Sequence, residues 1–174
     1  MIDFIRFPTR YKGTHHAFYN YGEGFCIFSD IAVACNRALI EFPELVRQVL
    51  IIDLDVHQGN GNAKLFQDDP QVFTFSMHCK DNYFSEKQQS NIDVELEAGL
   101  SDDEYLSKLK VWLPYLMDVV KPQLVFLQAG VDIFEGDRLG KLRVTREGLM
   151  RRNSYVYQYV LRRNIKCVVT MGGG

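Results

Sequence analysis

The sequence predicts an α/β domain in which a mainly parallel sheet is flanked by helices. Short apolar runs recur along the chain, and helical patterns fall between them. This alternation is typical of a parallel sheet with helices packed on its faces. Polar and glycine-rich residues follow three of the apolar runs. Because ligands in such sheets bind beyond the carboxyl ends of the strands, we expect a functional site at that edge.

The first predicted strand covers residues 49–54, a continuous apolar run of the kind that is buried on both faces of a parallel sheet. Later strands are predicted at residues 72–77, 124–128 and 166–171. Between them, helices are predicted at residues 30–42, 102–120 and 145–163. Ser101 and Glu104 form a capping box for the second helix, since each side chain can bind a free backbone N–H at the helix start.

Composition indicates one globular domain. The chain has 174 residues, of which 47% are hydrophobic and 24% charged, a balance that argues against disorder. The formal net charge is −2, so the chain has no broad basic field for nucleic acid. One basic cluster, Arg151 and Arg152 with Arg162 and Arg163, lies in a helical pattern and is interpreted as a solvated helix face.

Cysteine usage favours a reducing compartment. Cys26, Cys35, Cys79 and Cys167 form no C-x-x-C pair, so a disulfide framework is not predicted. The N-terminal residues lack the layout of a secretory signal, and no apolar run is long enough to span a bilayer. We therefore expect a cytoplasmic protein with no membrane partner, or a nuclear one if the source is eukaryotic.

Three residues after the strands have the chemistry of a metal site. Asp55 and His57 are two apart on an extended segment, so their side chains share one face. Asp132 follows a different strand and can supply a third ligand. One imidazole and two carboxylates suit Zn²⁺ or Fe²⁺, and three protein ligands leave positions for water and substrate. Alternatively, Asp55 and His57 cap a strand while Asp132 lies in a turn, and the pattern alone leaves both interpretations open.

Two adjacent histidines, His15 and His16, are candidates for proton transfer. A histidine near a metal-activated water can take its proton and pass it to a leaving amine. A carboxylate behind such a histidine raises its basicity and fixes its tautomer, and Asp53 is a candidate for that partner. Paired histidines in a loop are also common without any function.

At these residues the sequence resembles the histone deacetylase superfamily, in particular its class IV and bacterial class IV-like branch. The resemblance implies a partial arginase/deacetylase-like fold. It extends in family order through nearly the whole chain. The matching stretches are residues 13–17, 22–34, 49–61, 73–78, 102–106, 128–140 and 169–174.

The resemblance implies a role for each matching residue of the metal site. Asp55, His57 and Asp132 match the zinc ligands. His16 matches the general base that later acts as an acid, and His15 matches the histidine that assists electrostatically.

Further positions match residues around the zinc. Asp53 matches the carboxylate behind the first histidine, and Asn60 stands where many members have the aspartate behind the second. Phe25 and Tyr83 match the aromatic walls of an acyl-lysine channel, to which Gly130 is also assigned. Asp53 and Ser76 match side chains of a monovalent-cation site, so K⁺ is a second expected ion.

The implied reaction is the zinc-dependent hydrolysis of an acyl-lysine peptide or a small acyl amide. An acetylated polyamine is an alternative substrate, which an acidic rim residue such as Glu86 or Glu135 would favour. Neither a direct nucleic-acid contact nor a particular oligomeric state is implied.

The sequence also departs from the family pattern. It ends at Gly174, where the family places a tyrosine that donates to the oxyanion, and the elements that precede the tandem histidines in the family are absent. Residues 83–84 read Tyr-Phe in place of the common Phe-Pro pair. We therefore expect residues 1–174 to form a single partial catalytic domain. It is either a fragment of a complete enzyme or a catalytically impaired homologue that acts as a metal-binding or interaction module.

Overall fold

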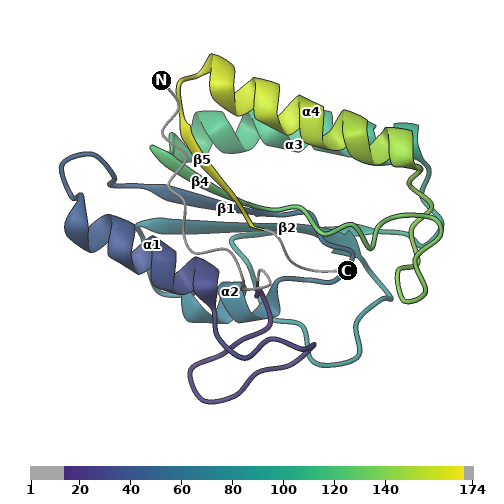
Figure 1. Ribbon diagram of the computed structural model, residues 1–174, viewed down its shortest axis with the longest axis horizontal. Coiled ribbons are helices and arrows are strands. Elements are labelled where there is room, and N and C mark those ends of the chain that lie inside the picture. Colours follow the sequence, from purple (N-terminus) through teal and green to yellow (C-terminus); the bar gives the residue numbers. More distant parts are fainter. Residues whose placement is uncertain (1–13, 171–174) are drawn as a thin grey trace.

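The computed structural model describes residues 14–170, in which five strands form one sheet in the order β3-β2-β1-β4-β5 (Figure 1). Every pairing between neighbouring strands of this sheet is parallel. The strands are β1 (Val49–Asp53), β2 (Val72–Cys79), β3 (Ile92–Leu96), β4 (Leu124–Gln128) and β5 (Lys166–Thr170). The four predicted strands are confirmed within two residues at their ends, apart from Met171, which lies outside the described residues. Strand β3 was not predicted.

Helices cover both faces of the sheet. In Figure 1, α3 and α4 lie on one face, and α1 and α2 lie on the other. The helices are α1 (Asp30–Glu41), α2 (Asn60–Leu65), α3 (Asp102–Val120) and α4 (Arg146–Arg162). Helix α2 was not predicted, whereas the other three agree with the predicted ranges. The capping box of α3 is confirmed, since the Glu104 carboxylate accepts a hydrogen bond of 3.0 Å from the backbone N–H of Ser101.

The central strand β1 carries the core on both of its faces. Leu50 and Ile52 pack into the apolar cluster beneath α3 and α4, and Val49 and Ile51 pack into the cluster beneath α1. All four side chains are fully buried. Burying an aliphatic side chain of this size contributes about 1.5–3 kcal/mol, so the two clusters hold the sheet from both sides. No helix within residues 14–170 is both long and apolar enough to cross a membrane.

The interpretation of the four arginines as one solvated face is wrong for Arg152. Arg151, Arg162 and Arg163 are exposed, but Arg152 is fully buried. Its guanidinium donates hydrogen bonds to three main-chain carbonyl oxygens, those of Leu54 (3.2 Å), Ala129 (3.0 Å) and Gly130 (2.8 Å). These carbonyls make burial of a charged group tolerable.

Candidate metal centre

The parallel strands bring the three predicted ligands to one edge of the sheet. Strand β1 pairs with β4 in a register that aligns Asp53 with Gln128. The segments that follow these two residues therefore leave the sheet side by side. As a result, one ligand atom from each of Asp55, His57 and Asp132 lies within 4.8 Å of the others.

Among the described residues, two carboxylate oxygens of the cluster accept no hydrogen bond. His57 Nδ1 lies 3.1 Å from Asp55 Oδ1 and 3.1 Å from Asp132 Oδ2. Asp132 Oδ1 accepts a hydrogen bond of 2.9 Å from the backbone N–H of Val56. Oδ2 of Asp55 and Oδ2 of Asp132 are buried, and neither accepts a hydrogen bond from the described residues. Buried carboxylates are costly unless they are paired or bind a cation, so this donor set fits a divalent ion such as zinc.

Electrostatics in the cluster favour a bound cation. Burial alone would lower the pKa of His57, but the close contacts of its ring with the carboxylates of Asp132 and Asp55 raise that pKa to about 10. Burial and the neighbouring Asp55 raise the pKa of Asp132 above its usual value. The site thus holds a proton among crowded carboxylates. A metal ion would displace that proton, because a ligating imidazole must be deprotonated.

Glycines allow the loops to approach the acidic side chains. A Cβ on Gly130 would lie 2.2 Å from Oδ2 of Asp55, and a Cβ on Gly59 would lie 2.2 Å from Oδ2 of Asp53. Any larger residue at these positions would push the carboxylate away. Gly130 was assigned to the substrate channel, and the structure places it directly against a metal-ligand candidate.

His15 lies between two carboxylates. Its Nδ1 is 2.7 Å from Oδ2 of Asp53, the candidate partner carboxylate, and its Nε2 is 3.8 Å from Asp55 Oδ2. Burial opposes the charged form of His15, but the charges of Asp53 and Asp55 outweigh burial and raise its pKa to about 9. His15 is therefore a cation at neutral pH.

The imidazole of His16, in contrast to that of His15, is uncharged. Burial and the neighbouring His15 lower the pKa of His16 to about 3. Its Nδ1 is 2.7 Å from Oδ1 of Asn60, and its ring centroid is 6.1 Å from that of His57. A neutral imidazole therefore stands next to the metal-ligand cluster, beside a charged one.

The two predicted cation-site side chains lie on adjacent strands. Asp53 of β1 pairs in register with Ser76 of β2. The Ser76 hydroxyl lies 3.0 Å from Nδ1 of the buried His78, and it accepts a hydrogen bond of 3.4 Å from the backbone N–H of Gly59. The K⁺ site stays a prediction.

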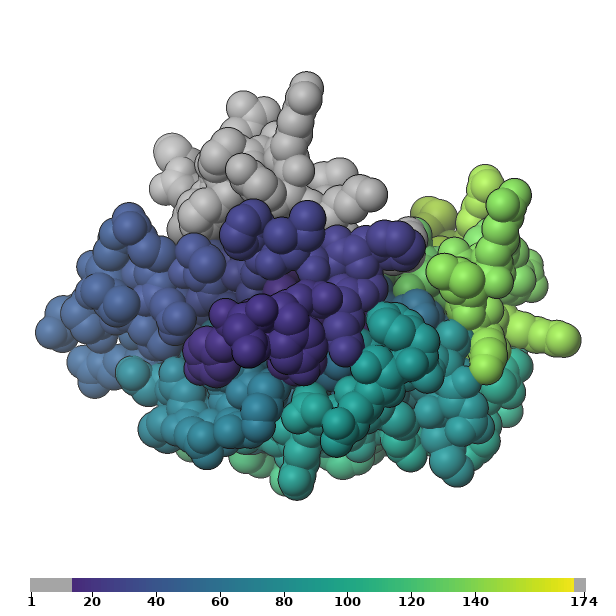
Figure 2. Space-filling model, turned by 90° about the horizontal axis from the view of Figure 1, so that it is seen from below, coloured from purple at the N-terminus to yellow at the C-terminus, as the bar shows by residue number. Residues whose placement is uncertain are grey.

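The predicted aromatic walls differ in their environment. Phe25 is 94% exposed, whereas the Tyr83 hydroxyl donates a hydrogen bond of 3.1 Å to Glu23. The neighbouring Phe84 is 66% exposed, and its ring centroid lies 6.2 Å from that of His16. Figure 2 shows the purple segment that contains Glu23 packed against the teal surface that follows β2. Sequence reasoning placed Tyr83 and Phe84 at the channel but missed Glu23, because no local pattern links Glu23 to Tyr83 or His16.

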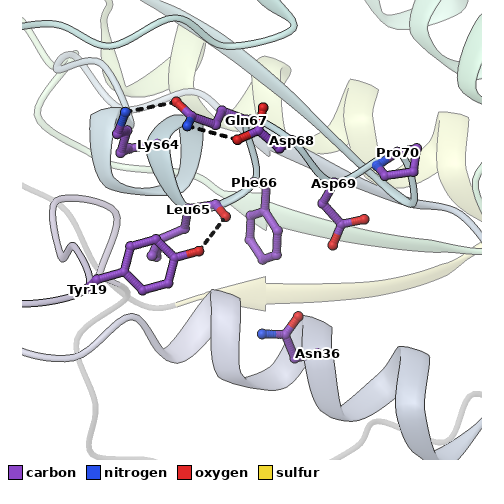
Figure 3. Close-up of a pocket in the computed structure, with 9 residues that line it drawn as sticks. All are labelled: Tyr19, Asn36, Lys64, Leu65, Phe66, Gln67, Asp68, Asp69 and Pro70. Carbon is purple, nitrogen blue, oxygen red and sulfur yellow. Dashed lines mark hydrogen bonds between the residues drawn. The ribbon is translucent and has the colours of Figure 1, made fainter.

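A hollow of about 450 Å³ lies elsewhere on the molecule, between α1 and the end of α2 (Figure 3). Its lining contains none of the candidate metal ligands or the tandem histidines. Several of its polar groups satisfy one another, since Lys64 donates to Gln67 and Gln67 donates to Asp68. The candidate site is therefore defined by its side-chain chemistry and not by this hollow.

Comparison with known proteins agrees with this geometry. The family model described as the histone deacetylase domain matches residues 7–174. The chain is 52% identical over 162 residues to an uncharacterized protein of Picosynechococcus, an alignment that covers 93% of this chain and 53% of that protein. It is 36% identical over 165 residues to histone deacetylase 2 of Arabidopsis thaliana, covering 93% of this chain and 42% of the relative.

A solved structure supports the fold. The crystal structure of the HDA15 HD domain superposes with a TM-score of 0.75 at 27% identity, covering 93% of this chain and 49% of that one. The chain spans about half or less of the length of these proteins. The names of these relatives carry no subclass, so class IV stays a prediction. With a family model that matches almost its whole length and a parallel sheet of the same architecture, the chain belongs to the histone deacetylase family.

Proposed function

We propose that the protein is a zinc-dependent hydrolase that removes an acyl group from an acyl-lysine or a similar amide. The observation that carries the proposal is the cluster of Asp55, His57 and Asp132 with His15 and His16 beside it. Its position beyond the carboxyl ends of parallel strands is where such sheets bind ligands. The similarity to histone deacetylase 2 of Arabidopsis thaliana supports the reaction class.

Asp55, His57 and Asp132 would hold the zinc ion. Zinc in such a site polarises an acyl carbonyl and lowers the pKa of a bound water. Three protein ligands are the number that catalytic zinc sites use, because the remaining positions stay open for water and substrate.

His16 has the protonation state of a general base. With a pKa lowered to about 3, its imidazole is neutral and can accept a proton from the attacking water. The same nitrogen can then return the proton to the amine nitrogen as the amide bond breaks. Asp53 favours the protonated form of His15, which would help to stabilise the negative charge that develops on the carbonyl oxygen.

Several finer assignments belong to the same proposal. Phe25 and Tyr83 remain the proposed channel walls, and the exposed Phe84 is an additional candidate. Asp53 and Ser76 are proposed to bind K⁺. Residues 1–174 are proposed to form one partial catalytic domain with cytoplasmic localisation.

Metal analysis and a peptide assay test the proposal. The purified protein should contain one zinc per chain and release acetate or a longer acyl product from acyl-lysine peptides. A chelator should abolish turnover, and added zinc should restore it. Acetylated polyamines, assayed in parallel, test the alternative substrate. A protein that binds no zinc and shows no chelator-sensitive turnover would rule out the enzyme and favour a non-catalytic module.

A further inference from the structure

The side-chain amide of Asn60 is held in one orientation toward His16 by hydrogen bonds on its other side. Its Oδ1 is 2.7 Å from His16 Nδ1, while its Nδ2 donates to Glu23 Oε2 at 3.2 Å and to the main-chain carbonyl oxygen of Glu86 at 3.3 Å. An ionised carboxylate only accepts hydrogen bonds, and an amide nitrogen only donates them. Glu23 therefore requires the amide nitrogen of Asn60 on its own side and leaves the amide oxygen for His16.

Tyr83 is oriented by the same carboxylate. Its hydroxyl donates to Glu23 Oε2 at 3.1 Å, and its oxygen lies 3.1 Å from His16 Nδ1. Because the hydroxyl proton is given to Glu23, the oxygen can only accept at His16. Both neighbours of Nδ1 are thus acceptors, and Nδ1 must carry the ring proton.

Glu23 is itself held in place. Its Oε1 accepts a hydrogen bond of 2.8 Å from the Ser85 hydroxyl, and its backbone N–H donates to the His16 carbonyl oxygen at 3.0 Å. The adjacent Gly24 packs against the His16 ring so closely that a Cβ would lie 2.6 Å from Cδ2. The loop that carries Glu23 is therefore fitted to the histidine.

We propose that Glu23 is a positioning residue that fixes the ring proton of His16 on Nδ1 by orienting Asn60 and Tyr83, which leaves Nε2 free to accept a proton. This inference rests on the proposed function, because it concerns the base of that reaction. A neutral imidazole has a single N–H, so the tautomer decides whether the reacting nitrogen is an acceptor at all. Glu23 acts on His16 through Asn60 and Tyr83, whereas an aspartate at position 60 would place its negative charge directly beside the ring.

Glu23→Gln tests the proposal with little change in shape. A glutamine can also donate, so Tyr83 can turn its proton toward His16 and favour the tautomer protonated at Nε2. We expect kcat to fall about 10-fold and KM to stay unchanged. The fall is smaller than the roughly 10²–10⁴-fold contribution of a general base, because part of the His16 population keeps the reactive tautomer. Glu97→Gln removes the same charge from an exposed glutamate whose side chain pairs with Lys80, and it should behave as wild type.

Moving the carboxylate from position 23 to position 60 should restore kcat. Asn60→Asp alone places a second carboxylate beside that of Glu23, at about the 3.2 Å that now separates Asn60 Nδ2 from Glu23 Oε2. We expect this variant to have a lower kcat. In Glu23→Gln/Asn60→Asp the new aspartate only accepts, while the glutamine introduced at position 23 can donate to it. His16 is again protonated at Nδ1, so the double variant should recover kcat to within about 3-fold of wild type. Purely additive losses would contradict the proposal.

Nitrogen-15 NMR of the His16 ring separates this inference from the proposed function, because it needs no turnover. Wild type should show a protonated Nδ1 and an unprotonated Nε2 at neutral pH, and Glu23→Gln should show a mixture. A wild-type protein protonated at Nε2 would overturn the inference without reference to any variant. If wild type is inactive yet shows the expected tautomer and shift, the proposed function fails and the role of Glu23 in orienting His16 stands.

Discussion

The guanidinium of Arg152 donates a hydrogen bond of 2.8 Å to the carbonyl oxygen of Gly130, two residues before the metal-ligand candidate Asp132. A second hydrogen bond from the same nitrogen reaches the carbonyl oxygen of Leu54, which immediately precedes Asp55. One buried side chain from α4 therefore ties together the two segments that supply the candidate ligands. Planar guanidinium groups suit this task, because they offer several donors in a fixed arrangement.

Arg152→Leu should destabilise the protein by about 3–5 kcal/mol, since it removes the donor from three main-chain carbonyl oxygens, and two of these hydrogen bonds are buried. Arg151→Leu is the matched control. Arg151 is exposed and pairs with Asp103 at 3.0 Å, so its loss should cost less than about 1 kcal/mol. Urea unfolding measures both. Equal losses for the two neighbouring arginines would show that the buried contacts do not stabilise the fold.

Asp132→Asn should weaken zinc binding by more than about 100-fold, because even residues that only support a ligand change metal affinity by 10–100-fold. Asp118→Asn changes an exposed aspartate on α3 and should leave the affinity unchanged. Competition with a coloured zinc chelator gives both values. The ligand assignment of Asp132 would fail if the two variants bound zinc equally well.

Gly130→Ala should lower zinc affinity by about 10–100-fold, because its methyl group would displace the Asp55 carboxylate. Gly99→Ala provides the contrast. Gly99 has a φ of +82° and open space around its missing Cβ, so alanine there should cost about 1–2 kcal/mol of stability without changing zinc affinity. Chelator competition and thermal unfolding of both variants separate the two effects. A Gly130→Ala protein with wild-type zinc affinity would contradict the close approach of Gly130 to Asp55.

His78 should make the metal-free protein less stable in mild acid. Burial lowers its pKa to about 4, so the unfolded chain, with a histidine pKa of 6.5, takes up a proton first as pH falls. Stability is therefore lost between pH 6.5 and 4, by up to about 2 kcal/mol at pH 5. Urea unfolding at pH 7 and pH 5, with a chelator present, should show a smaller pH effect in His78→Gln. An identical pH dependence in both proteins would argue against a neutral, buried His78.

The elements that could be predicted are those whose pattern reflects burial. Strand β1 and helix α3 were predicted because a continuous apolar run and a capping box are local signals. Helix α2 was missed because its first residues are Asn-Gly-Asn, which are poor helix formers. It is held by tertiary contacts, including a hydrogen bond from the backbone N–H of Gly61 to the His15 carbonyl oxygen.

The sequence also contains patterns that indicate strand β3 and the burial of Arg152, although neither was predicted. Strand β3 has buried Val94 and Leu96 alternating with exposed Asp93 and Glu95, a pattern typical of an edge strand. Arg152 lies four residues before Val156 in the buried stripe of α4, so its spacing indicated burial although its charge did not. Glu23 left no comparable signal, because its partner Asn60 is distant in the sequence and only the folded chain brings them together.

The most direct test of the account is a crystal structure of the zinc-loaded protein with anomalous scattering recorded at the zinc absorption edge. We predict one strong peak about 2.0–2.2 Å from a ring nitrogen of His57 and from a carboxylate oxygen of each of Asp55 and Asp132. A peak located away from these three residues, or none in protein soaked with excess zinc, would contradict the metal centre on which the proposed reaction depends.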